Sequence, residues 1–544
     1  MSRVQRLELL VFIATFFAFA YFHQGGGWNQ NSRFAEVRAI VEQGRFAIDD
    51  FLIYQRDAAS GVLRRIPTRA AEYEIGGRHH RLAWVDMAWT LFPINESPAA
   101  EGVKLAPMIE LCSSGDLGYV PHTGHFHPNK PPGTSFLGVP AYFIAYHVER
   151  ALGMNPDAWW TLTLNAWITT IGSIGLISAL ACVLFFRLAR EFAGGALFPA
   201  AAATLAFAFG TTFFPFATLF FDHAATGSLL FAALYFVRRK SAGALLLAGA
   251  CAGLAAITNY LAAVPVAFLA AYALLARLDG TASKADFRRT AIYLAGVLPF
   301  LILICWYNAV NFGSPTRLAN DFQSPLFKDT GAFLGMFVLP SSYVAGLITV
   351  SPYRGIFFLS PVLIMAAWSL VAWLADKARS AEARLCLAIF GFFFLVNISF
   401  NGYHGGFSAG PRYLVPGLPF LALPLVVAFA RWRWCPSRTS SSSRRQTRRT
   451  RSPSVATRAT TGGRTFRTIS SATTPGRSLP TGARGRCSIS CWVCIWKRRK
   501  RSLKRPVSIP TSASVASGKC AATCTKAWCE GRRVRFCSVR SRVP

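Results

Sequence analysis

The sequence predicts an all-α polytopic membrane protein with about ten transmembrane helices, a large extracytoplasmic first loop and an interfacial helix. Charged residues make up 15% of the 544 residues, whereas a soluble globular protein carries about a quarter. Hydrophobic residues make up 53%, and the mean hydropathy is +0.35. Long apolar runs recur along the chain, and basic residues gather on one side of the resulting topology. These observations exclude an ordinary cytosolic enzyme.

The first helix is expected within residues 1–23. Leu7 to Phe22 is continuously apolar and follows Arg3 and Arg6, which predicts an uncleaved span with a cytoplasmic N-terminus. Residues 24–133 are mixed and contain no run long enough to cross a bilayer, so they predict a folded extracytoplasmic loop.

Residues 134–150 predict an interfacial helix, because the apolar run there is short and contains Pro140. If this segment does not cross, sixteen basic residues lie on the cytoplasmic side and five on short outer segments. A crossing would reverse that bias. Residues 151–432 then form a bundle of about nine helices, predicted from apolar runs near 159–186, 195–213, 221–237, 242–258, 260–276, 291–308, 355–375, 385–400 and 413–430.

Residues 433–544 form a basic, low-complexity tail with 27 Lys and Arg against a single acid, Glu530. The formal net charge of +34 is therefore concentrated there, and it does not indicate nucleic-acid binding. Eight of the 13 cysteines also lie in this tail, and their spacing matches no disulfide framework. The composition favours a coding sequence read in the wrong frame over a disordered basic tail near anionic lipid.

Unusual polar residues all fall at the predicted extracytoplasmic ends of the spans, while the span centres contain no charged residue. Ion-coupled transporters need ionisable groups near the midplane, so this pattern argues against a secondary transporter. The outer residues that we take as candidates for substrate contact are Asp222, His223, Asn308 and His404.

Two stretches carry a family resemblance. Residues 28–50, directly after the first helix, and Asn129-Lys-Pro-Pro-Gly133 resemble segments of polyprenyl-phosphate-sugar-dependent glycosyltransferases. This C-type membrane superfamily includes protein O-mannosyltransferases and the lipid A aminoarabinose transferase. Further pieces agree in order at 218–223, 307–315, 351–355 and 405–414.

The resemblance implies a sugar carried on a membrane-embedded polyprenyl phosphate and a loop carboxylate that deprotonates the acceptor. The leaving phosphate needs cations, and we expect Lys130, Arg412 and Arg354 to contact it. Many members carry an acidic pair where this chain has Gln30 and Asn31, which puts the usual base in doubt.

The remaining candidates for the catalytic base are led by Asp116, which lies in the same motif block as Lys130, followed by Asp50. The other acids considered are Glu36, Asp49 and Asp57. The cluster of His122, His125 and His127 also suggests a divalent metal, although its spacing fits neither one helical face nor one strand face.

The sequence thus predicts a glycosyltransferase in a bacterial inner or plasma membrane, with its active site on the extracytoplasmic face. Its partners would be a polyprenyl-phosphate-sugar donor, membrane lipid, and a glycan, lipid or protein acceptor, with no nucleic acid. The alternatives are a non-enzymatic lipid-binding or transport protein and an inactive product of a frameshifted gene.

Overall fold

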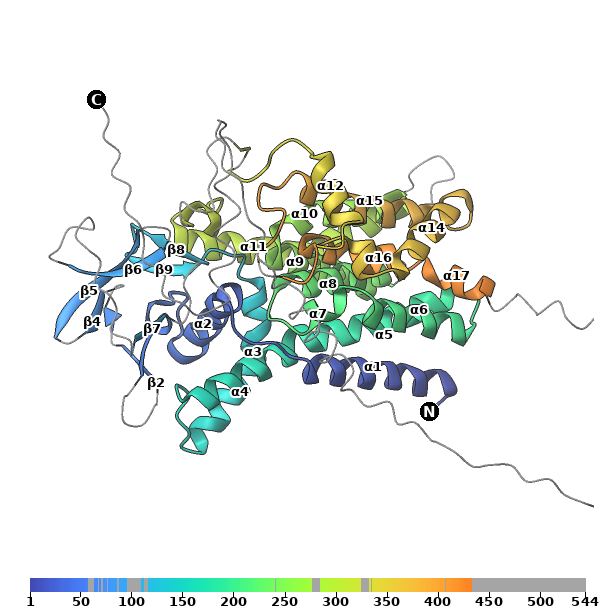
Figure 1. Cartoon of the computed structure of the whole chain (residues 1–544). Helices are drawn as coiled ribbons and strands as arrows, with labels where there is room; N and C mark the ends of the chain where they lie inside the picture. The colour runs from blue at the N-terminus through green and yellow to red at the C-terminus, as the bar shows by residue number, and fades with distance from the viewer. Residues whose placement is uncertain are drawn as a thin grey trace, which may run out of the picture. The chain divides into compact units, whose positions relative to one another are not determined.

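The computed structural model describes residues 1–432 apart from 57–62, 67, 70–71, 76, 86–87, 95–108, 112–115, 240, 276–283, 324–331, 334 and 407. The chain divides into two units, Met1–Gln446 and Thr447–Pro544, and every described residue belongs to the first (Figure 1). The predicted tail, its frameshift interpretation and Asp57 therefore lie outside the described residues.

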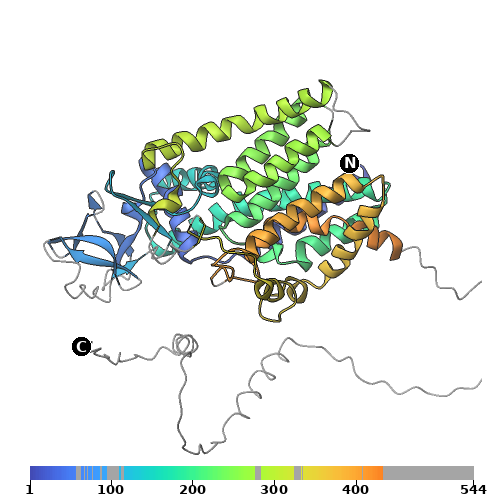
Figure 2. The ribbon, with the colours of Figure 1, turned by 90° about the horizontal axis from the view of Figure 1, so that it is seen from above.

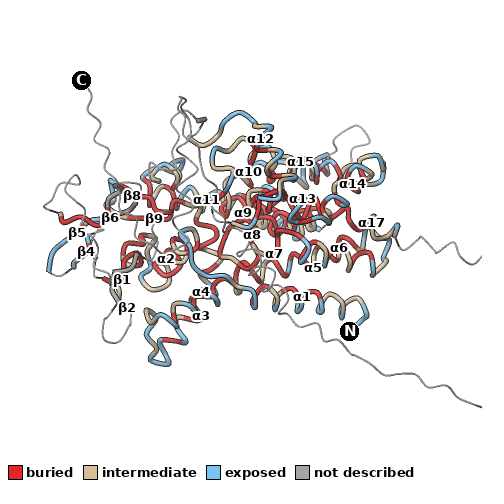
Figure 3. Tube along the Cα trace, in the orientation of Figure 1, coloured by how far each residue is buried: buried red, intermediate tan, exposed pale blue. Residues whose placement is uncertain are grey.

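Most of the first unit is a bundle of helices that run side by side (Figure 2). Buried side chains concentrate where these helices face one another (Figure 3). The bundle comprises α1 (Arg3–Tyr21), α4 (Trp159–Thr170), α5 (Leu176–Phe192), α6 (Leu197–Gly210), α7 (Phe213–Ala217), α8 (Asp222–Val237), α9 (Ala242–Thr258), α10 (Ala263–Leu275), α11 (Lys284–Phe312), α12 (Ser342–Thr349), α13 (Ile356–Leu359), α14 (Val362–Ala375), α15 (Ser380–Ile398), α16 (Leu418–Ala422) and α17 (Leu425–Trp432).

Four helices of the described part are long and apolar enough to cross a membrane: Arg3–Tyr21, Trp159–Phe192, Asp286–Phe312 and Ser380–Ile398. A bent pair, Arg412–Ala422 with Leu425–Arg431, raises the number to five. Four shorter apolar helices accompany them, and these features support an integral membrane protein. Each predicted apolar run contains a helix, but the expected total of ten crossings stays a prediction.

The segment after α1 corrects the all-α expectation, because it combines α2 (Trp28–Gln43) with antiparallel strands at one end of the bundle (Figures 1 and 2). The sheet orders are β2-β1-β7, β3-β4-β5-β6 and β8-β9. The strands are β1 (Ile53–Arg56), β2 (Leu63–Arg65), β3 (Thr68–Arg69), β4 (Glu72–Ile75), β5 (Arg78–Val85), β6 (Ala88–Pro93), β7 (Ile109–Leu111), β8 (Leu117–Val120) and β9 (His125–Pro128). Its core contains Ala35, Phe51, Leu91 and Phe126.

Helix α3 (Gly133–Ala151) follows this mixed segment and contains Pro140, and its interfacial location stays a prediction. It is not among the candidate spans of the described residues. A Cβ on Gly133 would lie 2.5 Å from the amide nitrogen of Thr258, so only glycine allows the start of α3 to pack on the end of α9. This contact holds the preceding Lys130 near the end of α9.

The contact between α9 and α11 depends on small residues. A Cβ on Gly249 would overlap the carbonyl oxygen of Tyr293, and one on Gly296 would overlap that of Leu246. Close approach of this kind is how helices associate inside a bilayer, where apolar lipid removes the hydrophobic driving force between them.

Candidate functional site

A cavity of about 560 Å³ lies where the start of α2, the start of α8, the end of α9 and the segment after α11 meet. One wall is apolar and includes Leu261, Met336, Phe337, Val396 and Phe400. The polar part of the lining contains Asn29, Arg33, Lys130, Asp222, His223, Asn259, Asp321 and Arg412. The structure therefore brings four of the predicted site residues together: Lys130, Asp222, His223 and Arg412.

Arg33 reaches the cavity because two glycines turn the chain sharply between α1 and α2. Gly26 and Gly27 have φ values of 85° and 107°, which residues with a Cβ rarely adopt. Arg33 is 1% exposed, and its Nη2 donates to Oδ1 of Asp222 at 2.7 Å. Its Nε and Nη1 have no hydrogen-bond partner among the described residues. A buried guanidinium with unused donors is suited to bind an anion.

Arg412 supplies a second guanidinium at the start of the final bent helix pair. Its Nη2 donates to the hydroxyl of Tyr413 at 2.9 Å, while its buried Nε has no hydrogen-bond partner in the described part of the chain. Arg33 and Arg412 thus line the same cavity from opposite ends of the described sequence, and each keeps a buried guanidinium nitrogen without a partner among the described residues.

Lys130 brings a third cation, and its Nζ lies 3.0 Å from Oδ1 of Asp116. Burial alone would raise the pKa of Asp116, but the neighbouring Lys130 ammonium, with smaller effects from Arg412 and Arg33, holds this pKa below its usual range. Asp116 does not line the cavity. Its ion pair with Lys130 favours the ionised carboxylate and reduces its strength as a base, and its predicted catalytic role stays a prediction.

Asp222 anchors a buried cluster of polar side chains at the start of α8. Besides Arg33, its carboxylate accepts a hydrogen bond of 2.6 Å from Nδ2 of Asn259, and Nδ1 of His223 lies 3.3 Å from Oδ2. The His223 ring packs edge-on against Tyr413, with 5.6 Å between the ring centroids. Both carboxylate oxygens are thus engaged, which favours a positioning role for Asp222.

Three predicted residues contact loop backbone and are not among the residues that line the cavity, so their roles stay predictions. Arg354 is buried and donates to the carbonyl oxygens of Gly406 at 2.6 Å and Gly410 at 3.1 Å. Nδ1 of His404 accepts from the amide of Gly406 at 3.0 Å. Asn308 donates to the carbonyl oxygen of Pro315 at 3.2 Å.

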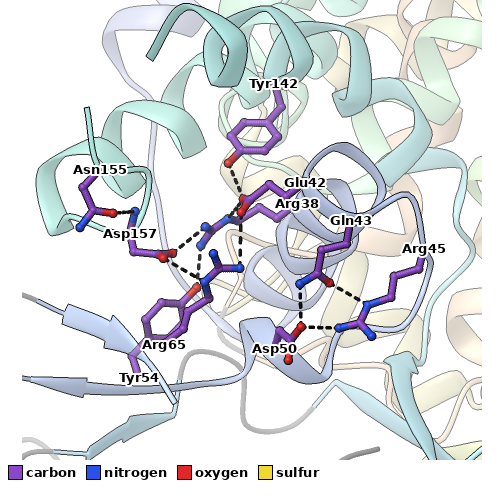
Figure 4. A network of polar contacts seen from close by, with 10 residues as sticks. All are labelled: Arg38, Glu42, Gln43, Arg45, Asp50, Tyr54, Arg65, Tyr142, Asn155 and Asp157. Atoms are coloured by element: carbon purple, nitrogen blue, oxygen red, sulfur yellow. Dashed lines mark hydrogen bonds and ion pairs between the residues drawn. The ribbon is translucent and has the colours of Figure 1, made fainter. Parts of the chain in front are cut away.

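Asp50 also lies outside the cavity lining, and its predicted catalytic role stays a prediction. Its carboxylate accepts a hydrogen bond of 2.6 Å from Gln43 and forms an ion pair with Arg45 (Figure 4). These partners come from the end of α2 and the turn after it, so local pairing accounts for its position.

The same view shows a buried network centred on Arg38, which contacts Glu42 at 2.6 Å, Asp157 at 2.7 Å and the Tyr54 hydroxyl at 2.6 Å (Figure 4). Asp157 precedes α4 and also pairs with Arg65 at 2.9 Å. The network therefore ties the mixed segment to the start of the long helix Trp159–Phe192.

The three histidines do not converge, and no group of three metal-ligating side chains occurs among the described residues. Nδ1 of His125 lies 3.0 Å from Oδ2 of Asp49, and this hydrogen bond raises the pKa of His125. Burial lowers the pKa of His127 to about 4, and its ring packs on Phe312. His122 lies against Gly313. The predicted metal site is thus corrected, because each ring has a separate environment.

Several lining residues were not among the predicted site residues: Asn29, Arg33, Asn259 and Asp321. The sequence does carry a signal for Asn259, because this polar residue separates two apolar runs. Arg33 is separated from Asp222 by 189 residues, and no local sequence pattern predicts that the two side chains pair.

No family model matches the chain, and no curated protein sequence matches it. A solved structure that resembles it is the crystal structure of ArnT from Cupriavidus metallidurans in the apo state, with 16% sequence identity and a TM-score of 0.42 over 78% of this chain. The chain spans 58% of the length of that protein. A likeness at this level assigns neither a family nor a residue's role.

Proposed function

We propose that the chain is an integral membrane glycosyltransferase that takes a sugar from a polyprenyl-phosphate donor. The acceptor would be an envelope glycan, lipid or protein on the extracytoplasmic face. The observation that carries the proposal is the convergence of Arg33, Lys130 and Arg412 on one cavity with an apolar wall. The resemblance of residues 28–50 and of the Lys-Pro-Pro-Gly segment supports the same reaction.

The three cations would bind the donor phosphate, and the apolar wall would contact the first isoprenoid units. In the reaction, an acceptor oxygen forms a bond to the anomeric carbon while the bond from that carbon to the phosphate oxygen breaks. The phosphate leaves with the electron pair, and the cations stabilise the charge that develops on it. The acceptor's proton passes to a carboxylate.

Asp321 is the carboxylate best placed to take that proton. Of the two acids that line the cavity among the described residues, Asp222 is buried and engaged by Arg33 and Asn259. Asp321 is exposed and lies on η4 (Ala319–Phe322), where its Oδ2 accepts a hydrogen bond of 3.1 Å from the amide of Leu318. In this proposal Asp116 orients Lys130 through their ion pair, and Asp321, in place of Asp116, is the catalytic base.

The first test measures binding of radiolabelled polyprenyl phosphate to the purified chain in nanodiscs. Loss of one charge-assisted contact in Lys130→Gln or Arg412→Gln should weaken binding about tenfold or more. Arg150→Gln, an exposed arginine of α3, is the matched control and should bind as the wild type does. Equal binding by all four proteins would refute the phosphate site.

The second test separates an enzyme from a lipid-binding protein. Membranes are supplied with polyprenyl-phosphate mannose or polyprenyl-phosphate aminoarabinose, and release of polyprenyl phosphate is measured. Asp321→Asn should abolish release while leaving phosphate binding intact. If the wild type binds polyprenyl phosphate through these cations but releases none from either donor, the chain is better explained as a non-enzymatic lipid-binding protein.

A further inference from the structure

A second cavity, of about 410 Å³, lies where α5 ends, α15 begins and α17 ends. Its lining includes Phe192, Arg379, Val427 and Arg431. Arg379 directly precedes α15, whereas Val396 near the other end of that helix lines the first cavity. The rise of an α-helix puts these two residues about 26 Å apart, so the cavities lie toward opposite ends of the bundle.

The charges around this second cavity leave it positive. The neighbouring acids Glu191 and Glu382 are already neutralised, because they form ion pairs with Arg239 and Arg238. Asp376 lies 3.3 Å from Arg379, which also donates to the carbonyl oxygen of Phe192.

Arg431 has no ion pair among the described residues, although it lines the same cavity and is exposed. The excess charge of the cavity is therefore that of the Arg431 guanidinium, which lies near the end of α17. Phe192 and Val427 add apolar surface beside it.

A ligand that matches this surface has a phosphate for the arginines and an apolar portion that continues along the helices. Basic pockets between membrane helices on the cytoplasmic side bind the headgroups of anionic lipids in this way. The positive-inside pattern predicts this end of the bundle to be cytoplasmic. Residues 433–544 carry the same sign of charge as the cavity, so they are not its electrostatic complement.

We propose that Arg379 and Arg431 bind the headgroup phosphate of an anionic glycerophospholipid in this cavity. The site is separate from the donor site, and its occupation does not depend on whether the chain transfers a sugar. It would tie the end of the final helix to the start of α15 through a bound lipid.

Native mass spectrometry of the purified full chain can test this, with phosphatidylglycerol as the probe and phosphatidylcholine as the zwitterionic reference. The double variant Arg379→Gln/Arg431→Gln should bind its first phosphatidylglycerol about tenfold more weakly or worse. Arg384→Gln, an exposed arginine on the same helix α15, should leave the affinity unchanged. Lys130→Gln should also leave it unchanged, which separates this site from the donor cavity.

Equal phosphatidylglycerol affinity in the wild type and the double variant would overturn the proposal, as would equally tight binding of phosphatidylcholine. Displacement of the lipid by an equal concentration of inorganic phosphate would show a simple anion site and would also overturn it. If the double variant does not fold, Arg431→Gln alone provides the test, because this exposed side chain has no ion pair among the described residues. It should still weaken lipid binding about threefold or more.

Discussion

Replacing Arg38 by Gln should destabilise the protein far more than replacing Asp50 by Asn, although both residues belong to ion pairs of the same segment. Arg38 is 1% exposed and contacts Glu42 at 2.6 Å and Asp157 at 2.7 Å. Removing one partner of a buried pair leaves uncompensated charge, which costs about 3–5 kcal/mol. Asp50 pairs with Arg45, whose side chain is 41% exposed. Such a pair contributes only about 0–1 kcal/mol.

The assay is reversible denaturant unfolding of the purified protein at constant detergent, followed by tryptophan fluorescence. Adding Glu42→Gln and Asp157→Asn to Arg38→Gln removes the two carboxylates that lost Arg38. Arg65 then loses the same two partners, but its side chain is 29% exposed and can be solvated, so this triple variant should recover part of the lost free energy of unfolding. A loss below about 1 kcal/mol for Arg38→Gln, or an equal loss for Asp50→Asn, would refute the reasoning.

Three further predictions concern the helix seam, a buried carboxyl and the donor site. Gly249→Leu should abolish the stable fold in a thermal unfolding scan, because its side chain would overlap α11; an unchanged midpoint would contradict the close packing. Burial raises the pKa of Glu36 from 4.5 to about 7, although the Tyr307 hydroxyl donates to it, so the free energy of unfolding should fall as the pH rises between these values. Glu36→Gln should lack this fall, and a pH profile identical to the wild type would refute the assignment. Asp116→Asn should weaken binding of polyprenyl phosphate less than Lys130→Gln does, and the reverse order would show that Asp116 contacts the ligand itself.

The helices of the bundle could be predicted because a long apolar run has few alternatives to a helix in a membrane. The strands after α1 could not. They are short, as in the four-residue β8 and β9, and charged or aromatic residues interrupt any simple alternation. Local pattern therefore located the mixed segment without revealing that its core is built on sheets.

The candidate site could be predicted where rare polar residues interrupt apolar sequence, as Asp222, His223 and Arg412 do. For the other residues, the hydrogen-bond partners that the fold supplies decide whether a side chain is available to a ligand. Arg354 has the composition of a ligand-binding residue, but loop carbonyls occupy its guanidinium. Arg33 looks like an ordinary helix-surface arginine until the fold brings it to the buried start of α8. Such partners come from distant segments, which composition and spacing do not report.

The continuous helix Trp159–Phe192 has 34 residues. At the rise of an α-helix it is about 51 Å long, whereas the hydrocarbon core of a bilayer is about 30 Å thick. A helix of this length must tilt within the bilayer or project beyond it, and Trp159, its first residue, is exposed. Asp157, two residues before this helix, forms an ion pair with Arg38 and so connects this end of the helix to the mixed segment. A bilayer that changed the tilt of this helix would therefore also move the mixed segment.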